Sequence, residues 1–350
     1  MHRKKEALKN APPSPAFTRE DLLSALPTFD PQKAIATRAA NGAVMNALAE
    51  VFPALVGGSA DLEGSNKTGL KKYGWISADD FSGRNFHWGV RELAMTAIVN
   101  GLTAYEDLRG FGATFFVFSD YCRPAIRLAA IMEVPSIFVF SHDSFYVGED
   151  GPTHEPVEQE AQIRLMEKLK NHKGRNSMMV LRPADVEETT IAWKLAMENI
   201  DSPTGLILSR QNINNLPEGT DYAQAAKGAY IVKDEENADV IMVASGSEVS
   251  TLVAGAELLA KDGIKTRIVS VPSEGLFRSQ SKEYQESILP TGAKIFGLTA
   301  GIPANLQGLV GVNGKIWGLE SFGFSAPFKV LDEKLGFNAE NVYNQVKSML

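Results

Sequence analysis

Three observations predict two α/β domains in tandem. The chain has 350 residues, more than the usual length of one domain. Short apolar segments of strand length alternate with segments of helical periodicity, which indicates a parallel sheet covered by helices on both faces. The alternation stops at a polar segment, residues 212–226, and then restarts. We therefore predict a lead-in over residues 1–30, a first domain over 31–212 and a smaller second domain over 213–350.

The lead-in is polar and contains several prolines, at positions 12, 13, 15 and 27. Proline restricts the residue before it to extended conformations, so a linker is predicted, with one short helix around residues 18–26. A chain that opens on a linker suggests that another segment precedes it. The first ten residues are basic but lack the apolar stretch of a secretory signal.

The first domain is expected to alternate strands and helices. Residues 39–51 place Val44, Leu48 and Val51 at helical spacing, and residues 136–140 form an uninterrupted apolar run typical of a buried parallel strand. The expected helices cover residues 39–51, 92–102, 123–132 and 187–199. The expected strands cover residues 55–58, 114–118, 136–140, 178–181 and 204–208.

In the second domain the pattern restarts with a strand at 240–244, a helix at 249–261 and a strand at 266–270. Residues 246–248 precede the helix and could bind an anion, because helix N-termini present free N–H groups. The sequence favours a plainer alternative, in which Ser247 caps the helix.

Composition excludes several classes of function. The formal charge of −7 argues against a general nucleic-acid binder, although local arginines can still bind phosphorylated small molecules. The single cysteine, Cys122, cannot form an internal disulfide, which suits the reducing cytoplasm. We see no apolar run long enough to cross a bilayer. The protein is therefore expected to be cytoplasmic, with no nucleic-acid or membrane partner.

Two segments in the N-terminal part of the first domain contain candidate functional residues. Residues 57–66 form a glycine-rich loop directly after a strand, where ligands bind in open parallel sheets. A turn followed by a helix cap would explain the same loop. Residues 86–92 lead into an apolar helix that starts with Arg91 and Glu92. Such a pair is usually an exposed ion pair, but the apolar surroundings favour a role for Glu92 in proton transfer.

Two further segments follow later strands. Residues 114–121 contain four aromatic side chains, which are either core or an apolar slot for a ring-shaped cofactor. Residues 141–156 contain His142 and His154 with four acidic residues and two glycines. Zinc is the obvious alternative ligand, but these histidines lack helical metal-ligand spacing, so no metal-binding residue is predicted.

Together these segments resemble the transketolase family. The similarity extends from about residue 31 to the C-terminus, and the matching runs are residues 57–66, 87–101, 114–128, 142–159, 181–185, 208–211 and 322–327. Residues 148–159, Gly-Glu-Asp-Gly-Pro-Thr-His-Glu-Pro-Val-Glu-Gln, are of transketolase type rather than of the deoxyxylulose-phosphate synthases or pyruvate dehydrogenase beta subunits. The resemblance implies a thiamine-diphosphate pyrimidine-binding domain followed by a transketolase C-terminal domain.

The resemblance also implies a cofactor, thiamine diphosphate. Glu92 would hydrogen-bond the ring nitrogen of its aminopyrimidine, and Asp61 would lie close to the cofactor. Phe115, Phe118 and Tyr121 would pack around the pyrimidine ring.

The implied reaction transfers a two-carbon ketol unit from a ketose phosphate to an aldose phosphate, as in the pentose phosphate pathway. Arg38, Ser65 and Arg210 match the family's sugar-phosphate binders, and a guanidinium offers paired donors to phosphate oxygens. His142, Asp150 and His154 match residues that contact the sugar hydroxyls and the reacting oxygen. Glu92, His142 and His154 are thus the candidate catalytic residues.

The chain departs from the family pattern at a few positions. Phe145 and Tyr146 stand where many members have Ile-Gly, which could narrow the sugar channel. Leu93 replaces a frequent histidine or phenylalanine, and Glu155 replaces a common glutamine. Substrate preference is therefore open.

The Gly-Asp-Gly motif of the family's diphosphate-binding domain does not occur in the sequence. That domain would supply the diphosphate site and its Mg²⁺ or Ca²⁺. We therefore predict a chain that is inactive until it joins a diphosphate-binding domain or subunit, and that forms a homodimer through its own two domains. A separately encoded subunit and a fragment of a longer chain both fit. The alternatives are a non-catalytic or regulatory subunit, and another thiamine enzyme such as dihydroxyacetone synthase.

Overall fold

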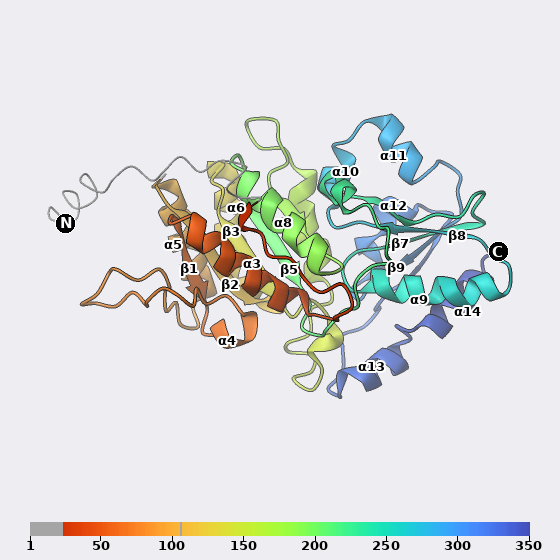
Figure 1. Ribbon diagram of the computed structural model, residues 1–350, viewed down its shortest axis with the longest axis horizontal. Coiled ribbons are helices and arrows are strands. Elements are labelled where there is room, and N and C mark those ends of the chain that lie inside the picture. The colour runs from red at the N-terminus through yellow and green to blue at the C-terminus, as the bar shows by residue number, and fades with distance from the viewer. Residues whose placement is uncertain (1–23, 106) are drawn as a thin grey trace.

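The computed structural model describes residues 24–105 and 107–350, and it contains two α/β domains side by side (Figure 1). The helix expected around residues 18–26 lies almost wholly outside the described residues. The predicted boundary at residues 212 and 213 remains a prediction.

The first domain is built on five parallel strands in the order β1-β2-β3-β5-β4. Almost every strand residue is buried, as expected for a parallel sheet covered on both faces. The strands are β1 (Leu55–Ser59), β2 (Arg109–Phe115), β3 (Ile137–Ser141), β4 (Met179–Leu181) and β5 (Thr204–Leu208).

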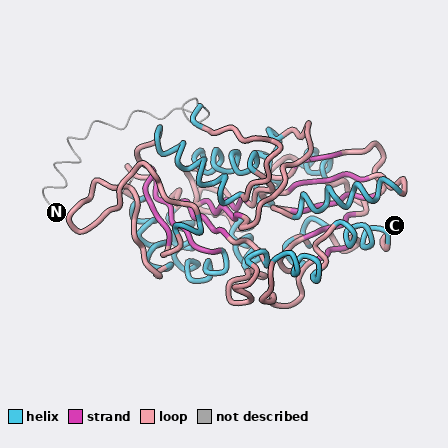
Figure 2. The backbone as a smooth tube through the Cα atoms, turned by 60° about the horizontal axis from the view of Figure 1, so that its bottom comes forward, coloured by secondary structure: helices cyan, strands magenta, loops and turns pink. Residues whose placement is uncertain are grey.

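Helices cover both faces of this sheet, as Figure 2 shows by the strands lying between helical layers. Helices α3 (Thr37–Val51) and α8 (Val186–Glu198) share one apolar core with the sheet, and α5 (Glu92–Ala104) and α6 (Ser119–Met132) share the other. Trp193 Nε1 of α8 donates to Asn41 Oδ1 of α3 at 2.8 Å. The shorter helical segments are α4 (Glu63–Asn66), η1 (Phe116–Phe118), η2 (Phe145–Val147), α7 (Gln159–Arg164) and η3 (Leu165–Lys168).

One predicted strand was misplaced. The strand expected at residues 114–118 is β2, which begins at Arg109 and ends at Phe115, while residues 116–118 form the 3₁₀ turn η1. The start of β2 was not predicted because its first residues include glycines, which break the apolar pattern typical of a strand. Gly110 and Gly112 are needed there, because a Cβ at either would press against α5 at Val99.

The second domain has a mixed sheet in the order β10-β9-β7-β8-β6, in which only β6 is antiparallel to its neighbour. The strand at 240–244, the helix beginning near 249 and the strand at 266–270 are confirmed. The strands are β6 (Tyr230–Lys233), β7 (Val240–Ala244), β8 (Thr266–Ser270), β9 (Ile295–Leu298) and β10 (Lys315–Trp317).

Helices α9 (Glu248–Lys261) and α14 (Ala339–Lys347) pack together closely on this sheet, where Gly255 leaves room for Val342. The remaining helical segments are η4 (Tyr222–Lys227), α10 (Glu274–Arg278), α11 (Lys282–Ile288), η5 (Pro303–Asn305), α12 (Gln307–Val310) and α13 (Phe328–Leu335). None of the helices in the described ranges is both long and apolar enough to span a membrane.

The start of α9 is neither an anion site nor a serine cap. Ser247 makes no side-chain cap, and its hydroxyl donates to Glu248 Oε2 at 3.0 Å. The Arg182 side chain of the first domain fills the space beside Gly246. The chain's own charged groups therefore occupy this helix start, and they join the two domains.

Candidate active site

The candidate site lies at the carboxyl edge of the first sheet, where consecutive strands each end in one of the predicted residues. Asp61 follows β1, Phe115 ends β2, His142 follows β3 and Arg210 follows β5. These four strands are neighbours in one parallel sheet, so their ends meet at the same edge. The topology therefore brings together residues that are distant in the sequence.

Two of these residues have an unusual backbone. Asp61 has φ of 60° and His142 has φ of 61°, which is the left-handed region that residues other than glycine seldom adopt. Such conformations cluster at functional sites, where the surrounding structure holds them in place. His142 comes directly after β3, and one residue, Ala60, separates Asp61 from β1.

Arg38 lies beside His142 and close to Arg210. Thr37 and Ser209 bond reciprocally, with Thr37 N 3.0 Å from Ser209 Oγ and Ser209 N 2.7 Å from Thr37 Oγ1, and this places the start of α3 against the end of β5. Arg38 Nη1 donates to the Ser65 carbonyl oxygen at 2.7 Å and lies 3.3 Å from His142 Nε2. Burial, together with the charge of Arg210, lowers the pKa of Arg38. Two guanidiniums that repel each other in a half-buried place favour an anion between them.

His142 is buried and neutral. Its ring stacks on Phe115 with centroids 3.7 Å apart, and its Nδ1 lies 2.7 Å from Ser141 Oγ. Burial and the nearby cations Arg38 and Arg210 lower the pKa of His142 to about 3. The imidazole can therefore accept or pass on a hydrogen bond without carrying charge at neutral pH.

A row of aromatic rings continues from His142 toward solvent. Phe115 and Phe118 are nearly parallel with centroids 6.1 Å apart, and Tyr121 lies 6.2 Å beyond Phe118. The His154 ring meets Phe118 edge-on at 5.5 Å. Phe115 is buried whereas Tyr121 is 62% exposed. The row therefore has a closed end at His142 and an open end at Tyr121.

Glu92 is buried at the first position of α5. Its backbone carbonyl accepts a hydrogen bond from Thr96 Oγ1 at 2.7 Å, and Cys122 Sγ lies 3.9 Å from the same oxygen. Glu92 thus lies against the start of α6, the helix that carries Tyr121. Arg91 is exposed and donates to the Trp88 carbonyl oxygen, so the exposed Arg–Glu ion pair that the sequence allowed is not formed.

The structure brings together Arg38, Ser65, Phe115, Phe118, Tyr121, His142, His154 and Arg210. Glu92 lies beside this cluster, at the contact of α5 with α6, and two other predicted residues stand apart. Asp61 is exposed and lines a neighbouring cavity of about 440 Å³ with His87 and Arg91. Asp150 is exposed on the loop after η2. Within residues 24–105 and 107–350, no hydrogen bond or ion pair joins either aspartate to the cluster.

Comparison with known proteins decides the family. Residues 33–215 match the model of the transketolase pyrimidine-binding domain, and residues 228–338 match the transketolase-like C-terminal domain. The chain belongs to the transketolase family. It is 47% identical over 328 residues to a transketolase of Halalkalibacterium halodurans and 45% identical over 330 residues to that of Bacillus subtilis. Each alignment covers 93% of this chain and 48% of the relative, so the chain spans about half the length of these transketolases.

Solved transketolases have the same fold. The structure from Leishmania mexicana superposes with a TM-score of 0.86 at 38% identity, covering 94% of this chain and 47% of that one. A structure described as a split-gene transketolase, an inactive beta4 tetramer, superposes with a TM-score of 0.69 and is covered over 99% of its length, against 91% of this chain. At 23% identity, that second likeness shows the fold alone.

One expected departure from other transketolases is corrected by the structure. The sequence left open that Phe145 and Tyr146 could narrow a sugar channel, but both side chains are buried in the core of the second domain. Phe145 packs on Phe337 with ring centroids 4.9 Å apart, and the Tyr146 hydroxyl donates to Asp332 Oδ1 at 2.6 Å. Large aromatic side chains here join the domains instead of facing the site.

Glu155, beside His154, is the departure that stays at the site. It is 2% exposed, and its carboxyl oxygens lack a well-formed hydrogen bond to any described residue. Burial raises the pKa of Glu155 to about 7, and the nearby N–H of Phe324 opposes this only in part. Any side chain at Gly323 would overlap with the Glu155 carboxyl. The second domain therefore contributes backbone next to Glu155, the residue that follows His154.

Three polar residues behind His142 were not predicted from the sequence, namely Ser59, Asn66 and Ser141. All three are buried and hydrogen-bonded to one another in a line. The sequence positions of two of them could have indicated a place at the site. Ser141 is a polar residue at the end of an otherwise apolar strand, and Asn66 is the last residue of the glycine-rich loop. Serine and asparagine at such positions are common without any catalytic role, so the sequence alone does not mark them as site residues.

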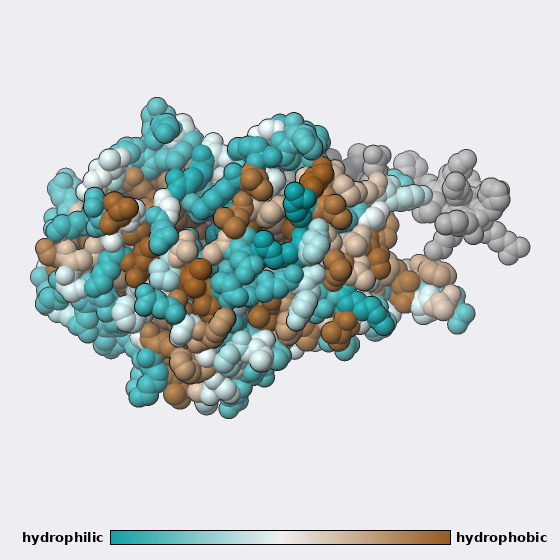
Figure 3. All heavy atoms as spheres, turned by 180° about the vertical axis from the view of Figure 1, so that it is seen from behind, coloured by the Kyte–Doolittle hydropathy of each residue, from teal (hydrophilic) through white to brown (hydrophobic). Residues whose placement is uncertain are grey.

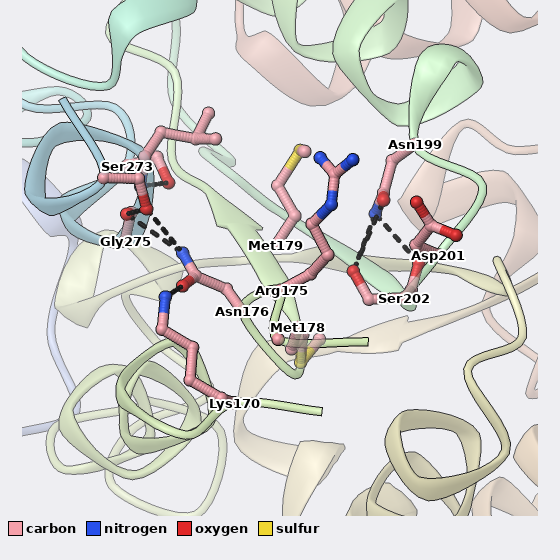
Figure 4. A pocket seen from close by; sticks show the side chains of 13 residues that line it. Lys170, Arg175, Asn176, Met178, Met179, Asn199, Asp201, Ser202, Ser273 and Gly275 are labelled. Carbon is pink, nitrogen blue, oxygen red and sulfur yellow. Dashed lines mark hydrogen bonds between the residues drawn. The ribbon is translucent and has the colours of Figure 1, made fainter. Parts of the chain in front are cut away.

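A separate cavity of about 320 Å³ lies where the two domains meet (Figure 4). It contains none of the predicted site residues. Asn176 is central to it, since Lys170 Nζ donates to Asn176 Oδ1 at 2.7 Å and Asn176 Nδ2 donates to the Gly275 carbonyl at 2.9 Å. These groups hold the first domain to α10, so the cavity marks the domain junction of this transketolase-family chain.

Proposed function

We propose that this chain supplies the pyrimidine side of a thiamine-diphosphate site and the sugar-phosphate site of a transketolase. The activity is transfer of a two-carbon ketol unit from a ketose phosphate to an aldose phosphate, in the pentose phosphate pathway. The observation that carries the proposal is the cluster of Arg38, Arg210 and His142 beside the aromatic row, within a domain that matches the transketolase pyrimidine-binding domain.

The residues present fit a pyrimidine ring. The aromatic row is open at Tyr121 and offers flat apolar surface, and Glu92 is a buried carboxyl at the start of the helix that packs beside this row. When bound, thiamine diphosphate supplies the nucleophilic carbon that carries the two-carbon unit. Glu92 would share a proton with the aminopyrimidine, and Phe115, Phe118 and Tyr121 would hold its ring. Asp61 would lie near the cofactor from the adjoining cavity.

The substrate side combines cationic side chains, which suit a phosphate, with histidines, which suit sugar hydroxyls. Arg38 and Arg210 would bind the phosphate, and Ser65 lies within reach because its carbonyl already contacts Arg38. His142 and His154, at the closed end and at the side of the aromatic row, would contact the sugar hydroxyls and move protons at the reacting oxygen. Asp150 would contact the sugar from its exposed loop.

We infer that a diphosphate-binding partner completes the site and contributes Mg²⁺ or Ca²⁺. Within the described residues, no group of three or more His, Cys, Asp or Glu could hold a metal ion. A diphosphate requires such charge compensation. We further expect the assembled enzyme to act in the cytoplasm.

The surface of the first domain offers a place for a second copy of the chain. Helices α5 and α6 carry large hydrophobic side chains that are about half exposed. Figure 3 shows hydrophobic side chains scattered among hydrophilic ones over both halves of one face of the molecule. We call this surface the α5–α6 apolar face and define it by Leu93, Ile98, Leu128, Ile131 and Met132. Exposed apolar surface of this kind marks protein–protein contacts, which supports the proposed homodimer.

The test is ketol transfer from xylulose 5-phosphate to ribose 5-phosphate with thiamine diphosphate and Mg²⁺. The chain is assayed alone, with a transketolase diphosphate-binding domain, and as a Glu92→Ala variant in the same mixture. The proposal expects activity in the mixture only, and its loss in the variant. Full activity of the chain alone would contradict the need for a partner. Activity that survives Glu92→Ala would contradict the assigned site.

Two alternatives are separated by the same assay. If the chain is a non-catalytic or regulatory subunit, the mixture should show no ketol transfer with any acceptor. Another thiamine-dependent ketol transferase, such as dihydroxyacetone synthase, would respond to formaldehyde as acceptor rather than to ribose 5-phosphate. The paired arginines Arg38 and Arg210 favour a phosphorylated acceptor.

A further inference from the structure

A line of hydrogen bonds runs behind His142, across the ends of the first three strands. Asn66, the last residue of α4, bridges β1 and β3 because α4 lies over the ends of both strands. The distances are 3.1 Å from Ser59 Oγ to the Ala113 carbonyl oxygen, 2.5 Å from Asn66 Nδ2 to Ser59 Oγ, 2.6 Å from Ser141 Oγ to Asn66 Oδ1, and 2.7 Å from Ser141 Oγ to His142 Nδ1.

The chemistry of the groups determines the direction of every bond. The Ala113 carbonyl can only accept, so Ser59 gives its one hydroxyl proton to it. Ser59 Oγ must then accept from Asn66, which turns the amide nitrogen of Asn66 toward Ser59 and its oxygen toward Ser141. Because that oxygen can only accept, Ser141 donates its hydroxyl proton to Asn66.

The same logic reaches His142 from both sides. Ser141 Oγ has no proton left, so it accepts, and His142 Nδ1 must carry the proton. On the other side of the ring, Nε2 faces Arg38 Nη1 at 3.3 Å. A guanidinium can only donate, so Nε2 must be the acceptor. A carbonyl at one end and a guanidinium at the other therefore impose the same tautomer.

Burial keeps this arrangement in one state. Ser59, Asn66, Ser141 and His142 are each at least nine-tenths buried. The stacking of His142 on Phe115 fixes the plane of the ring. Burial and the neighbouring cations also lower the pKa of His142 to about 3, which agrees with a neutral imidazole.

We propose that Asn66 is a positioning residue for His142. Acting through Ser141, it holds the proton of the neutral imidazole on Nδ1, so that Nε2 faces the site as a hydrogen-bond acceptor. Nε2 has one lone pair, so a substrate group that meets it takes the place of Arg38 Nη1 and must likewise be a donor, a sugar hydroxyl, and not a carbonyl oxygen or an alkoxide. This inference rests on the proposed function for the identity of the substrate, but not for the tautomer.

Loss of Asn66 has a specific consequence. Without the amide oxygen, the Ser141 hydroxyl is free to turn and donate to His142 Nδ1. Arg38 alone then favours the proton on Nδ1, so a fraction of the molecules carries it on Nε2 and presents a donor to the substrate. Ser141→Ala removes the acceptor for Nδ1 with a smaller change in volume, so it also releases the proton from Nδ1.

The tautomer is measured directly by long-range ¹H–¹⁵N correlation NMR on the full chain labelled with ¹⁵N-histidine. The chain has five histidines, and the His142 signals are assigned by their loss in His142→Asn. We expect a protonated, pyrrole-type Nδ1 and an unprotonated, pyridine-type Nε2 at neutral pH. In Asn66→Ala and Ser141→Ala the Nδ1 signal shifts toward the pyridine type, whereas Ser141→Thr retains the native pattern.

Asn100→Ala is the matched control. Asn100 is also buried and also accepts a serine hydroxyl, that of Ser136 at 2.9 Å, but it does not contact His142. It should leave the His142 signals unchanged. A protonated Nε2 in the unaltered chain, a doubly protonated ring at neutral pH, or an equal shift in Asn100→Ala would each overturn the proposal. Because the spectrum needs no partner and no turnover, it can succeed or fail independently of the transketolase assay.

Discussion

Arg182 and Glu248 form a buried ion pair that joins the two domains, with Nη1 2.8 Å from Oε1 and Nη2 2.9 Å from Oε2. Arg182 follows β4 and Glu248 begins α9. The same guanidinium donates from Nη2 and Nε to Asp143 Oδ2, at 2.9 and 3.1 Å. Since Asp143 follows His142 in the chain, the second domain holds the loop of the candidate site through one arginine.

Arg182→Ala should strongly destabilise the chain. It leaves two carboxylates buried without their cation, a change that costs about 3–5 kcal/mol. Urea unfolding measures the free energy of unfolding. The control is Arg267→Ala, which removes a more exposed two-bond pair with Asp234 and should cost about 0–1 kcal/mol. Equal losses in the two variants would contradict the role given to Arg182.

Glu155→Gln should change how stability depends on pH. Burial raises the pKa of Glu155 from 4.5 to about 7, so the folded state binds more protons than the unfolded state between these values. The free energy of unfolding therefore falls as pH rises through this window. Glutamine cannot ionise, so the variant should be more stable above pH 7, by about 1–3 kcal/mol, the usual cost of a buried polar group without a partner.

Thermal unfolding of the variant and the unaltered chain over pH 4–8 is the measurement for Glu155. Glu257→Gln serves as a control, because Glu257 is exposed on α9. Parallel pH profiles for Glu155→Gln and the unaltered chain would show that Glu155 is ionised in the folded state at neutral pH.

Arg210→Ala should weaken binding of phosphorylated sugars selectively. Removing hydrogen bonds to a charged group costs about 1.5–3 kcal/mol, which corresponds to a rise in KM of about 10- to 100-fold. The assay uses the chain with its diphosphate-binding partner and compares a sugar phosphate with the same sugar lacking phosphate. A loss of equal size for both sugars would show that Arg210 acts on the fold rather than on the phosphate.

Leu128→Glu should disrupt self-association. A charge on the α5–α6 apolar face would have to be desolvated in the proposed homodimer, so the variant should sediment as a monomer where the unaltered chain sediments as a dimer. Val312→Glu is the matched control, because Val312 is 99% exposed and isolated from this face. A dimer that persists in Leu128→Glu would place the contact elsewhere.

The helices and apolar strands could be predicted because their periodicity is local. Residues 136–140 and 204–208 are continuous apolar runs, and both form central strands. Strand β2 was misplaced because Gly110 and Gly112 are selected by close packing against α5, a contact that no local pattern contains. The same limit explains Phe145 and Tyr146, whose partners Phe337 and Asp332 lie in the other domain.

The candidate site was partly predictable for a similar reason. Residues that follow parallel strands must meet at one edge, so His142 and Arg210 could be placed together from their positions after the predicted strands. Phe115 was expected inside a strand, so only the resemblance assigned it to the site. The order of hydrogen bonds through Asn66 could not be predicted, since it depends on which atoms face one another across β1 and β3.

The most direct test of the central claim is the rate at which the C2 proton of thiamine diphosphate exchanges for deuterium. NMR follows the exchange with the chain, with a diphosphate-binding domain, and with their mixture in the presence of Mg²⁺. If this chain supplies the carboxyl that shares the pyrimidine proton, exchange is fast only in the mixture. It should slow by about 10²- to 10⁴-fold with Glu92→Gln, and Glu257→Gln should leave it unchanged. Fast exchange in the mixture that Glu92→Gln does not slow, or equal exchange without the chain, would contradict the claim.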